Sequence, residues 1–190
     1  MGYIFMTLAA LMFGLNGSVT KVVVETGMSP AVLTFYRVLG TAVIAGVALL
    51  VSNRGAFRIT WARLAVMTLL GVAGVALMQF AYAAALALLP VGIVLLFQYT
   101  AVLMIPLVAF FILRQGVRTR LWIAVALVIV GLAVVAQVWA SALNPFGIAL
   151  ALVAAIALAI YYLVGERVLS TTPPLAVAFW TMLFASAFWA

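Results

Sequence analysis

The chain has 190 residues, of which 71% are hydrophobic and only 6% are charged, and its formal net charge is +7. Soluble domains carry roughly 25% charged residues, so this composition excludes a water-soluble fold. Cys, His and Asp are absent from the sequence, which excludes disulfides, thiolate or histidine metal sites, haem ligation and Ser-His-Asp catalysis. We therefore expect no cofactor, no metal and no catalytic residue, and an intramembrane enzyme is disfavoured.

Seven apolar runs follow one another along the chain. A backbone in lipid must satisfy its own hydrogen bonds, and runs of about 20 residues favour helices over the shorter strands of a barrel. The first run lacks the basic start and cleavage site of a signal peptide, so we expect it to be a span. The sequence predicts an all-α polytopic bundle with helices at Tyr3–Val24, Pro30–Val51, Leu64–Leu88, Val91–Leu113, Leu121–Trp139, Pro145–Val164 and Pro174–Ala190.

Basic residues are distributed unevenly over the connections between these runs. The second, fourth and sixth connections hold seven of them, whereas the other connections hold only Lys21, at a helix end. Cytoplasmic loops are enriched in Lys and Arg, so this pattern predicts a cytoplasmic N-terminus in an inner or plasma membrane. It also explains the net charge without a nucleic-acid partner. The seven residues are Arg54, Arg58, Arg63, Arg114, Arg118, Arg120 and Arg167.

Two segments near the C-terminus resemble two segments near the N-terminus. "GYIFMTLAAL" (Gly2–Leu11) aligns with "GIALALVAAI" (Gly147–Ile156), and "PAVLTFYRVL" (Pro30–Leu39) aligns with "PLAVAFWTML" (Pro174–Leu183). Alanine-rich membrane sequence can match itself by chance. A repeat instead predicts five helices in residues 1–143 and the first two helices of a second repeat in residues 144–190. Because five is odd, the second repeat would be inverted, which is typical of transporters.

The sequence resembles the EamA type of the drug/metabolite transporter superfamily. The resemblance rests on "AALMFGLNGSVTKVVVETGMSPAVLTFYRVL", "FAYAAALALLPVGIVLLFQYTAVL" and "RTRLWIAVALVIVGLAVV". It implies ten helices in two inverted five-helix repeats, of which this chain would cover the first seven. It also implies transport of small metabolites or drugs, often outward, by alternating access.

Two positions depart from the pattern of that family. Ala101 stands where a proline is usual early in the fourth helix, and Pro106 follows five residues later. Arg114 and Gln115 replace the usual Gly-Glu at the end of that helix, which puts the usual charge pairing of the following loop in doubt. We expect Pro106 to kink its helix, with neighbouring helices satisfying the freed backbone groups.

Arg37 is the one charged residue between Pro30 and Val51. It lies about 10 Å from the predicted outer end of its helix, at 1.5 Å rise per residue. One interpretation is that its side chain reaches the outer headgroups, toward Glu25. The other is a cation facing a cavity, where it binds a substrate carboxylate or holds helices together. The aligned position in the second repeat is Thr181.

Other polar residues lie at mid-depth in the predicted helices. Gln79 and Tyr82 are three residues apart, hence on one helix face. Gln98 and Tyr99 are adjacent to Thr100, so at least one of the three side chains must point inward. Asn16 is a further candidate. The amide and hydroxyl side chains are predicted to bind amino, carboxyl or hydroxyl groups of a substrate. For Asn16, a hydrogen bond between helices is the alternative.

A stripe of small residues runs along the first helix at a spacing of four: Ala10, Gly14 and Ser18. Small residues allow close helix contact, so we expect this face to pack against another helix. Lys21 and Glu25 share a helix face and are expected to pair at the rim. Trp61, Trp122 and Trp139 are expected at the membrane interfaces.

The sequence thus predicts a transporter of small metabolites, and the resemblance makes an exporter of amino acids or drugs the best interpretation. Its partners would be the lipid bilayer and a small-molecule substrate, with a homodimer left open. The alternative is a truncated or half-size membrane protein without independent transport, which acts as a dimer or with a partner.

Overall fold

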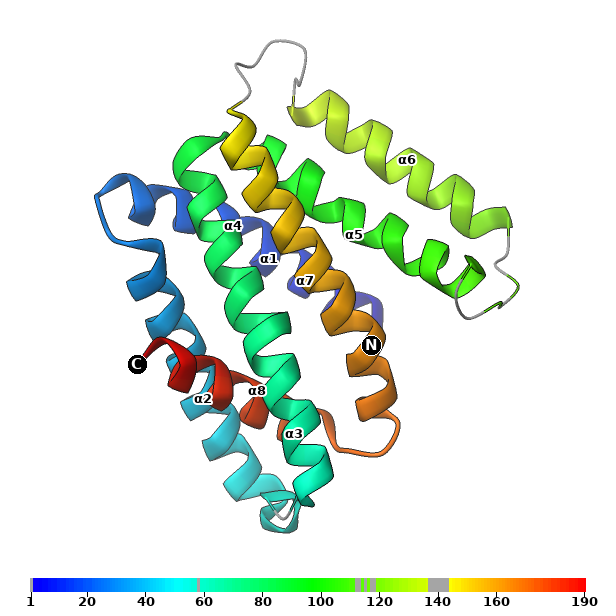
Figure 1. The fold of residues 1–190 in the computed structure, drawn as a ribbon. Coiled ribbons are helices and arrows are strands. Elements are labelled where there is room, and N and C mark those ends of the chain that lie inside the picture. The colour runs from blue at the N-terminus through cyan, green and yellow to red at the C-terminus, as the bar shows by residue number, and fades with distance from the viewer. Residues whose placement is uncertain (1, 58, 112–113, 115, 117–118, 137–143) are drawn as a thin grey trace.

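The computed structural model describes the chain except residues 1, 58, 112–113, 115, 117–118 and 137–143 (Figure 1). The described residues form helices and no strand. In chain order the helices are α1 (Gly2–Glu25), α2 (Pro30–Ser52), a 3₁₀ turn η1 (Arg54–Phe57), α3 (Trp61–Leu69), a π-helix η2 (Leu70–Ala76), α4 (Leu77–Leu88), α5 (Val91–Phe111), α6 (Thr119–Ala136), α7 (Pro145–Leu169) and α8 (Pro174–Trp189). Since α3, η2 and α4 are continuous, the predicted bundle of seven helical rods is confirmed.

The helix ends lie close to the predicted ones, with two differences. The third rod begins at Trp61 rather than Leu64, and α7 continues to Leu169 rather than Val164. Pro30, Pro145 and Pro174 each begin a helix, where the missing N–H costs no hydrogen bond. The predicted ends at Leu113 and Trp139 lie outside the described residues, as does Gln115.

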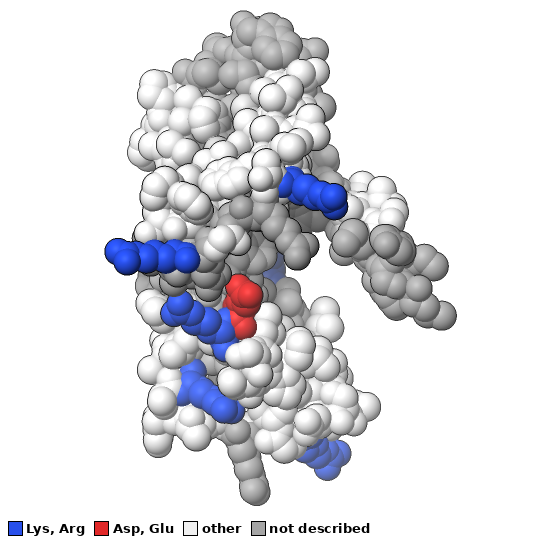
Figure 2. All heavy atoms as spheres, turned by 90° about the vertical axis from the view of Figure 1, so that its right-hand side faces the viewer, with Lys and Arg blue, Asp and Glu red and all other residues white. Residues whose placement is uncertain are grey.

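Four of the described helices are long and apolar enough to cross a bilayer: Pro30–Ser52, Trp61–Leu88, Val91–Val108 and Pro145–Leu169, with shorter apolar helices at Thr119–Val134 and Pro174–Trp189. Much of their surface faces outward and is apolar; Ile44 is 72% exposed and Val51 is 84% exposed. Figure 2 shows one face with few charged side chains, several of which lie close together around an acidic side chain, and the rest of its described surface is uncharged. Such a surface suits contact with lipid.

The rod of α3, η2 and α4 lies at the centre of the bundle (Figure 1). α1 packs on α4, α7 packs on both α4 and α5, and α6 packs on the other side of α5. α8 packs against α2 and η2. The largest buried cluster joins α4, α5 and α7 and includes Leu86, Leu89, Ile93, Val94, Ala151 and Ala154.

The π-helix η2 was not expected, because the sequence predicts an uninterrupted helix over Leu64–Leu88. Its glycines make very close contacts: a methyl group added at Gly71 would stand 2.5 Å from the Thr181 carbonyl oxygen. A methyl group at Gly74 would stand 3.1 Å from the Tyr161 ring. The absence of side chains at these two positions therefore lets α8 and α7 approach the centre of the rod, and π-helical turns of this kind are frequent at functional sites.

Helices α2 and α8, which the repeat pairs with each other, are in contact. Phe179, early in α8, packs on Gly46, late in α2, and Ala185 shares a buried cluster with Val38. The contacts thus run in opposite order along the two helices. The division into residues 1–143 and 144–190 stays a prediction.

Candidate functional site

Lys21 lies at the end of the bundle where α1 and α4 end and α5 begins. We call this the Lys21 end. The Nζ of Lys21 donates to the carbonyl oxygen of Leu86 at 2.6 Å and to that of Leu89 at 3.4 Å. Leu86 needs this donor because the residue four positions later is Pro90, which has no N–H. Lys21 therefore satisfies a carbonyl that the helix itself cannot satisfy.

The predicted pair of Lys21 and Glu25 is confirmed, with Nζ and Oε1 3.3 Å apart. Glu25 is largely exposed, with 60% of its side-chain surface accessible. Because exposed ion pairs contribute little, the contact of Lys21 with the α4 carbonyls is the stronger part of this arrangement.

Arg37 faces α1. Its Nη1 donates to the Thr20 hydroxyl at 3.2 Å, and that hydroxyl donates to the Asn16 carbonyl oxygen at 2.6 Å. Arg37 is half-buried, and within the described chain it forms no ion pair with Glu25. The guanidinium thus links α2 to α1, and its remaining N–H groups leave it able to bind a further acceptor.

A row of tyrosines continues from Arg37 through the bundle. Tyr82 is 5% exposed and lies within electrostatic range of Arg37 and of Tyr99. Tyr99 in turn lies within electrostatic range of Tyr162. Of the three tyrosines, Tyr82 is buried, Tyr99 is half-buried and Tyr162 is exposed, so the row runs from the interior to the surface.

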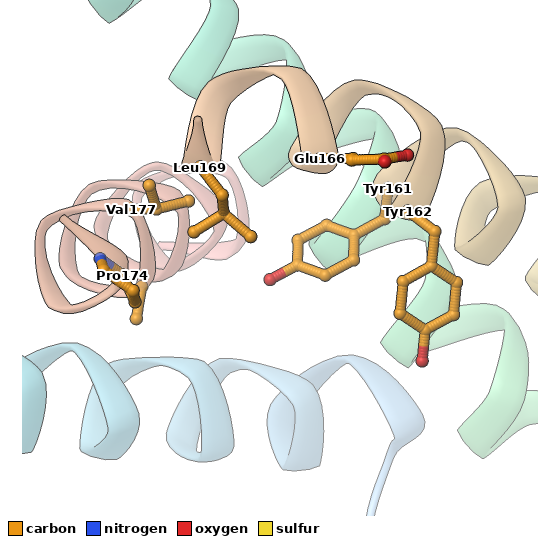
Figure 3. A pocket seen from close by; sticks show the side chains of 8 residues that line it. Tyr161, Tyr162, Glu166, Leu169, Pro174 and Val177 are labelled. Atoms are coloured by element: carbon orange, nitrogen blue, oxygen red, sulfur yellow. The ribbon is translucent and has the colours of Figure 1, made fainter. Parts of the chain in front are cut away.

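The row of tyrosines ends at a pocket of about 420 Å³ at the opposite end of the bundle, which we call the Glu166 end. The pocket is formed by the last turns of α7 and the first turns of α8, and its lining is Tyr161, Tyr162, Gly165, Glu166, Leu169, Pro174, Val177 and Ala178. Figure 3 shows the two tyrosine rings projecting from α7, with Glu166 above them and the α8 residues to one side. The pocket thus combines aromatic faces, two hydroxyls and one carboxylate.

The other polar candidates are placed as follows. Gln98 is 4% exposed, and its Oε1 has no partner among the described residues. Asn16 and Gln79 are half-buried. A substrate contact for these three residues, and for Tyr82 and Tyr99, stays a prediction.

The stripe of Ala10, Gly14 and Ser18 is exposed, and a methyl group at Gly14 would meet no described atom within 4 Å. This face meets no other described helix at Gly14, and the packing expected for it stays a prediction. α1 packs on α4 through another face, where a methyl group at Gly17 would stand 2.9 Å from the Tyr82 hydroxyl.

Pro106 lies inside α5 and is buried, and the helix continues on both sides of it. The kink expected there stays a prediction.

Sequence reasoning missed Tyr161, Tyr162 and Glu166 as a group, and it missed Lys21 as a hydrogen-bond donor to α4. The signal for Lys21 was present, since Pro90 predicts an unsatisfied carbonyl at Leu86. Tyr161 and Tyr162 shortly precede Glu166 in the sequence, but this pattern does not predict a pocket. Among the described residues, His, Cys, Asp and Glu do not gather in a metal-binding group.

A solved structure resembles this chain in fold. A crystal structure of a protein with 21% sequence identity superposes with a TM-score of 0.67, covering 95% of this chain and 66% of that chain. This likeness concerns the fold alone. No curated protein matches the chain.

The sequence profile of the EamA-like transporter family matches residues 1–137. This match covers most of the chain, and the apolar helices agree with it by making the chain a multi-pass membrane protein. The chain belongs to the EamA-like transporter family.

Proposed function

We propose that this protein is a carrier that exports small molecules with an amino group, such as amino acids or amine drugs, by alternating access. The observation that carries the proposal is the difference between the two ends of the bundle. Polar contacts join α1 to α4 and to α2 near the Lys21 end, whereas the Glu166 end contains a pocket of about 420 Å³. Alternating access requires a site that is closed on one side while it is reachable from the other.

The lining of the pocket supports an amine as substrate. Aromatic faces attract cations, and the Glu166 carboxylate would pair with an ammonium group. The volume falls within the range of about 300–1,000 Å³ that is usual for small-molecule sites. Arg37, at the far end of the row of tyrosines, would bind a carboxylate as the substrate passes.

The arginine distribution supports the direction of transport. It favours a cytoplasmic N-terminus and a cytoplasmic Glu166 end, from which substrate would enter the pocket. A reporter that is active only in the cytoplasm should be silent when fused after Ala140 and active when fused after Gly55. The reverse pattern would contradict the orientation.

The transport experiment uses the protein reconstituted in liposomes with a panel of labelled amino acids and amine drugs. Arg37→Ala should lower the transport rate by about tenfold or more, because a hydrogen bond to a charged group contributes roughly 1.5–3 kcal/mol. Arg54→Ala is the matched control: Arg54 is exposed and, among the described residues, donates to the Leu50 carbonyl of the preceding helix α2. That variant should transport within about twofold of the parent, since exposed charges contribute little.

Two results would contradict this proposal. If Arg37→Ala lowers only the amount of protein in the membrane, the residue serves packing rather than transport. If the parent protein moves no compound of the panel, the carrier function itself fails.

The competing function is a chain that transports only as a homodimer or with a partner. The chain spans 66% of the length of the solved protein it resembles. Reconstitution at one chain per liposome separates the two functions. Transport by single chains would refute the partner requirement, whereas activity that appears only at higher occupancy would establish it.

A further inference from the structure

A second pocket, of about 400 Å³, lies on another face of the α7 end. One wall comes from the first turns of α3, and the other comes from the last turns of α7 and the turn that follows. Its lining is Ala62, Arg63, Val66, Val164, Arg167, Val168, Thr171 and Thr172. The carrier function proposed above uses none of these residues.

The charges in this pocket are both positive, and the chain offers them no counterion. Arg63 and Arg167 are exposed and form no ion pair within the described chain. The whole sequence contains two acidic residues: Glu25 pairs with Lys21, and Glu166 lines the other pocket. Within the described residues, the two guanidinium groups are therefore left without a paired anion.

A buried hydroxyl adds a second, independent observation. Thr172 lines the pocket and is 6% exposed, yet its Oγ1 has no hydrogen-bond partner among the described residues. Buried polar groups are almost always paired, so an unpaired one calls for an absent partner. The neighbouring Thr171 hydroxyl is already used, since it donates to the Val168 carbonyl oxygen at 3.3 Å.

The remaining lining and the position of the pocket point to a lipid. Ala62, Val66, Val164 and Val168 give it an apolar side that would suit acyl chains. Trp61, immediately before it, is 86% exposed, and tryptophan is enriched at the level of the headgroups. Basic pockets between transmembrane helices are suited to the headgroups of anionic lipids.

We propose that this pocket binds the phosphate of an anionic phospholipid headgroup. Arg63 and Arg167 hold the phosphate oxygens from the two walls, and the Thr172 hydroxyl donates a hydrogen bond to one of them. The lipid would thereby connect the start of α3 to the end of α7.

The test measures lipid retained by the purified protein in native mass spectrometry, with phosphatidylglycerol and phosphatidylcholine as probes. The parent protein should retain phosphatidylglycerol in preference to phosphatidylcholine. The double variant Arg63→Gln/Arg167→Gln should lower the affinity for phosphatidylglycerol by about tenfold or more, as expected when charged hydrogen bonds are lost. Arg54→Gln/Arg120→Gln removes the same charge from exposed arginines elsewhere and should change the affinity by less than about twofold.

Thr172→Val keeps the shape of the side chain and gives a readout that does not depend on the arginines. Without lipid, its melting temperature should equal or exceed that of the parent, because the variant no longer buries an unpaired hydroxyl. The rise in melting temperature on adding phosphatidylglycerol should be smaller than in the parent.

Three outcomes would overturn the proposal: equal retention of phosphatidylcholine, an equal loss in the two double variants, or a full response of Thr172→Val to the lipid. A separate arm uses inorganic phosphate. If inorganic phosphate stabilises the protein and phosphatidylglycerol does not displace it, the site binds free phosphate instead of lipid.

Discussion

Helices α1 and α8 both pack on the central rod of α3, η2 and α4, but they do so by different means. α1 is held mainly through long side chains, with the Lys21 ammonium on the Leu86 carbonyl and the Tyr82 hydroxyl against Gly17. α8 is held through backbone, since Gly71 leaves no space between η2 and the Thr181 carbonyl.

The Lys21 contact of α1 can therefore open, whereas the Gly71 contact of α8 cannot. A lysine side chain has several rotatable bonds, so it can release a carbonyl and bind it again. The contact between Gly71 and the Thr181 carbonyl has no such freedom, because closely packed backbone atoms leave no room for either helix to move. We therefore expect α1 to move against the rod during transport while α8 stays attached to it.

The largest effect is expected for Gly71→Ala. The added methyl group would stand 2.5 Å from a backbone oxygen, and neither helix can give way cheaply, so the cost should be about 3 kcal/mol. The melting temperature in detergent measures it. Gly14→Ala is the control, because no described atom lies within 4 Å of the added methyl group. Equal losses in the two variants would show that α8 is not fixed through Gly71.

Lys21→Met should have the next largest effect, of about 2 kcal/mol, because the Leu86 carbonyl loses its donor beside Pro90. The sequence has no native cysteine, so a single cysteine placed at the buried Val24 can report opening of the Lys21 end. Lys21→Met should speed the labelling of that cysteine by a membrane-impermeant maleimide.

Glu25→Gln is the control for Lys21→Met. It removes only an exposed ion pair and leaves the carbonyl contact intact, so its effect should stay below about 1 kcal/mol. If Glu25→Gln opens the Lys21 end as far as Lys21→Met does, the ion pair rather than the carbonyl contact closes it.

A smaller effect than that of Lys21→Met is expected for Gly17→Ala, at about 1 kcal/mol, because the Tyr82 hydroxyl is a side-chain atom that can shift. Tyr82→Phe removes that hydroxyl and should make Gly17→Ala less costly. Melting temperatures of the parent, both single variants and the double variant measure this coupling. Strictly additive effects would show that α1 and α4 do not meet at this point.

Much of the fold could be predicted from the sequence because hydropathy and proline act locally. The apolar runs gave the seven rods, and Pro30, Pro145 and Pro174 stand at the starts that their missing N–H groups favour. The pairing of Lys21 with Glu25 was likewise predictable, since residues four apart share a helix face. The π-helix was not predicted, and the close contacts of its glycines could not be, because they are made with α7 and α8, far along the chain.

The candidate site, like the fold, could be predicted from the sequence only in part. Arg37 was identified as a lone charge in an apolar run, but its partner Thr20 depends on how α2 meets α1. The stripe of Ala10, Gly14 and Ser18 was identified by its spacing, yet α1 presents Gly17 to the rod instead. Spacing along a helix defines its faces but does not say which face meets a neighbour.

The sequence by itself determined that this protein is a helical membrane protein with an arginine in its second span, because composition and periodicity decide how a chain partitions into lipid. The tertiary structure decided that Lys21 satisfies a carbonyl of α4, that tyrosines from three helices form a row, and that two pockets flank the end of α7. These features join residues far apart in the chain, and they depend on which helix faces approach closely enough to exclude lipid.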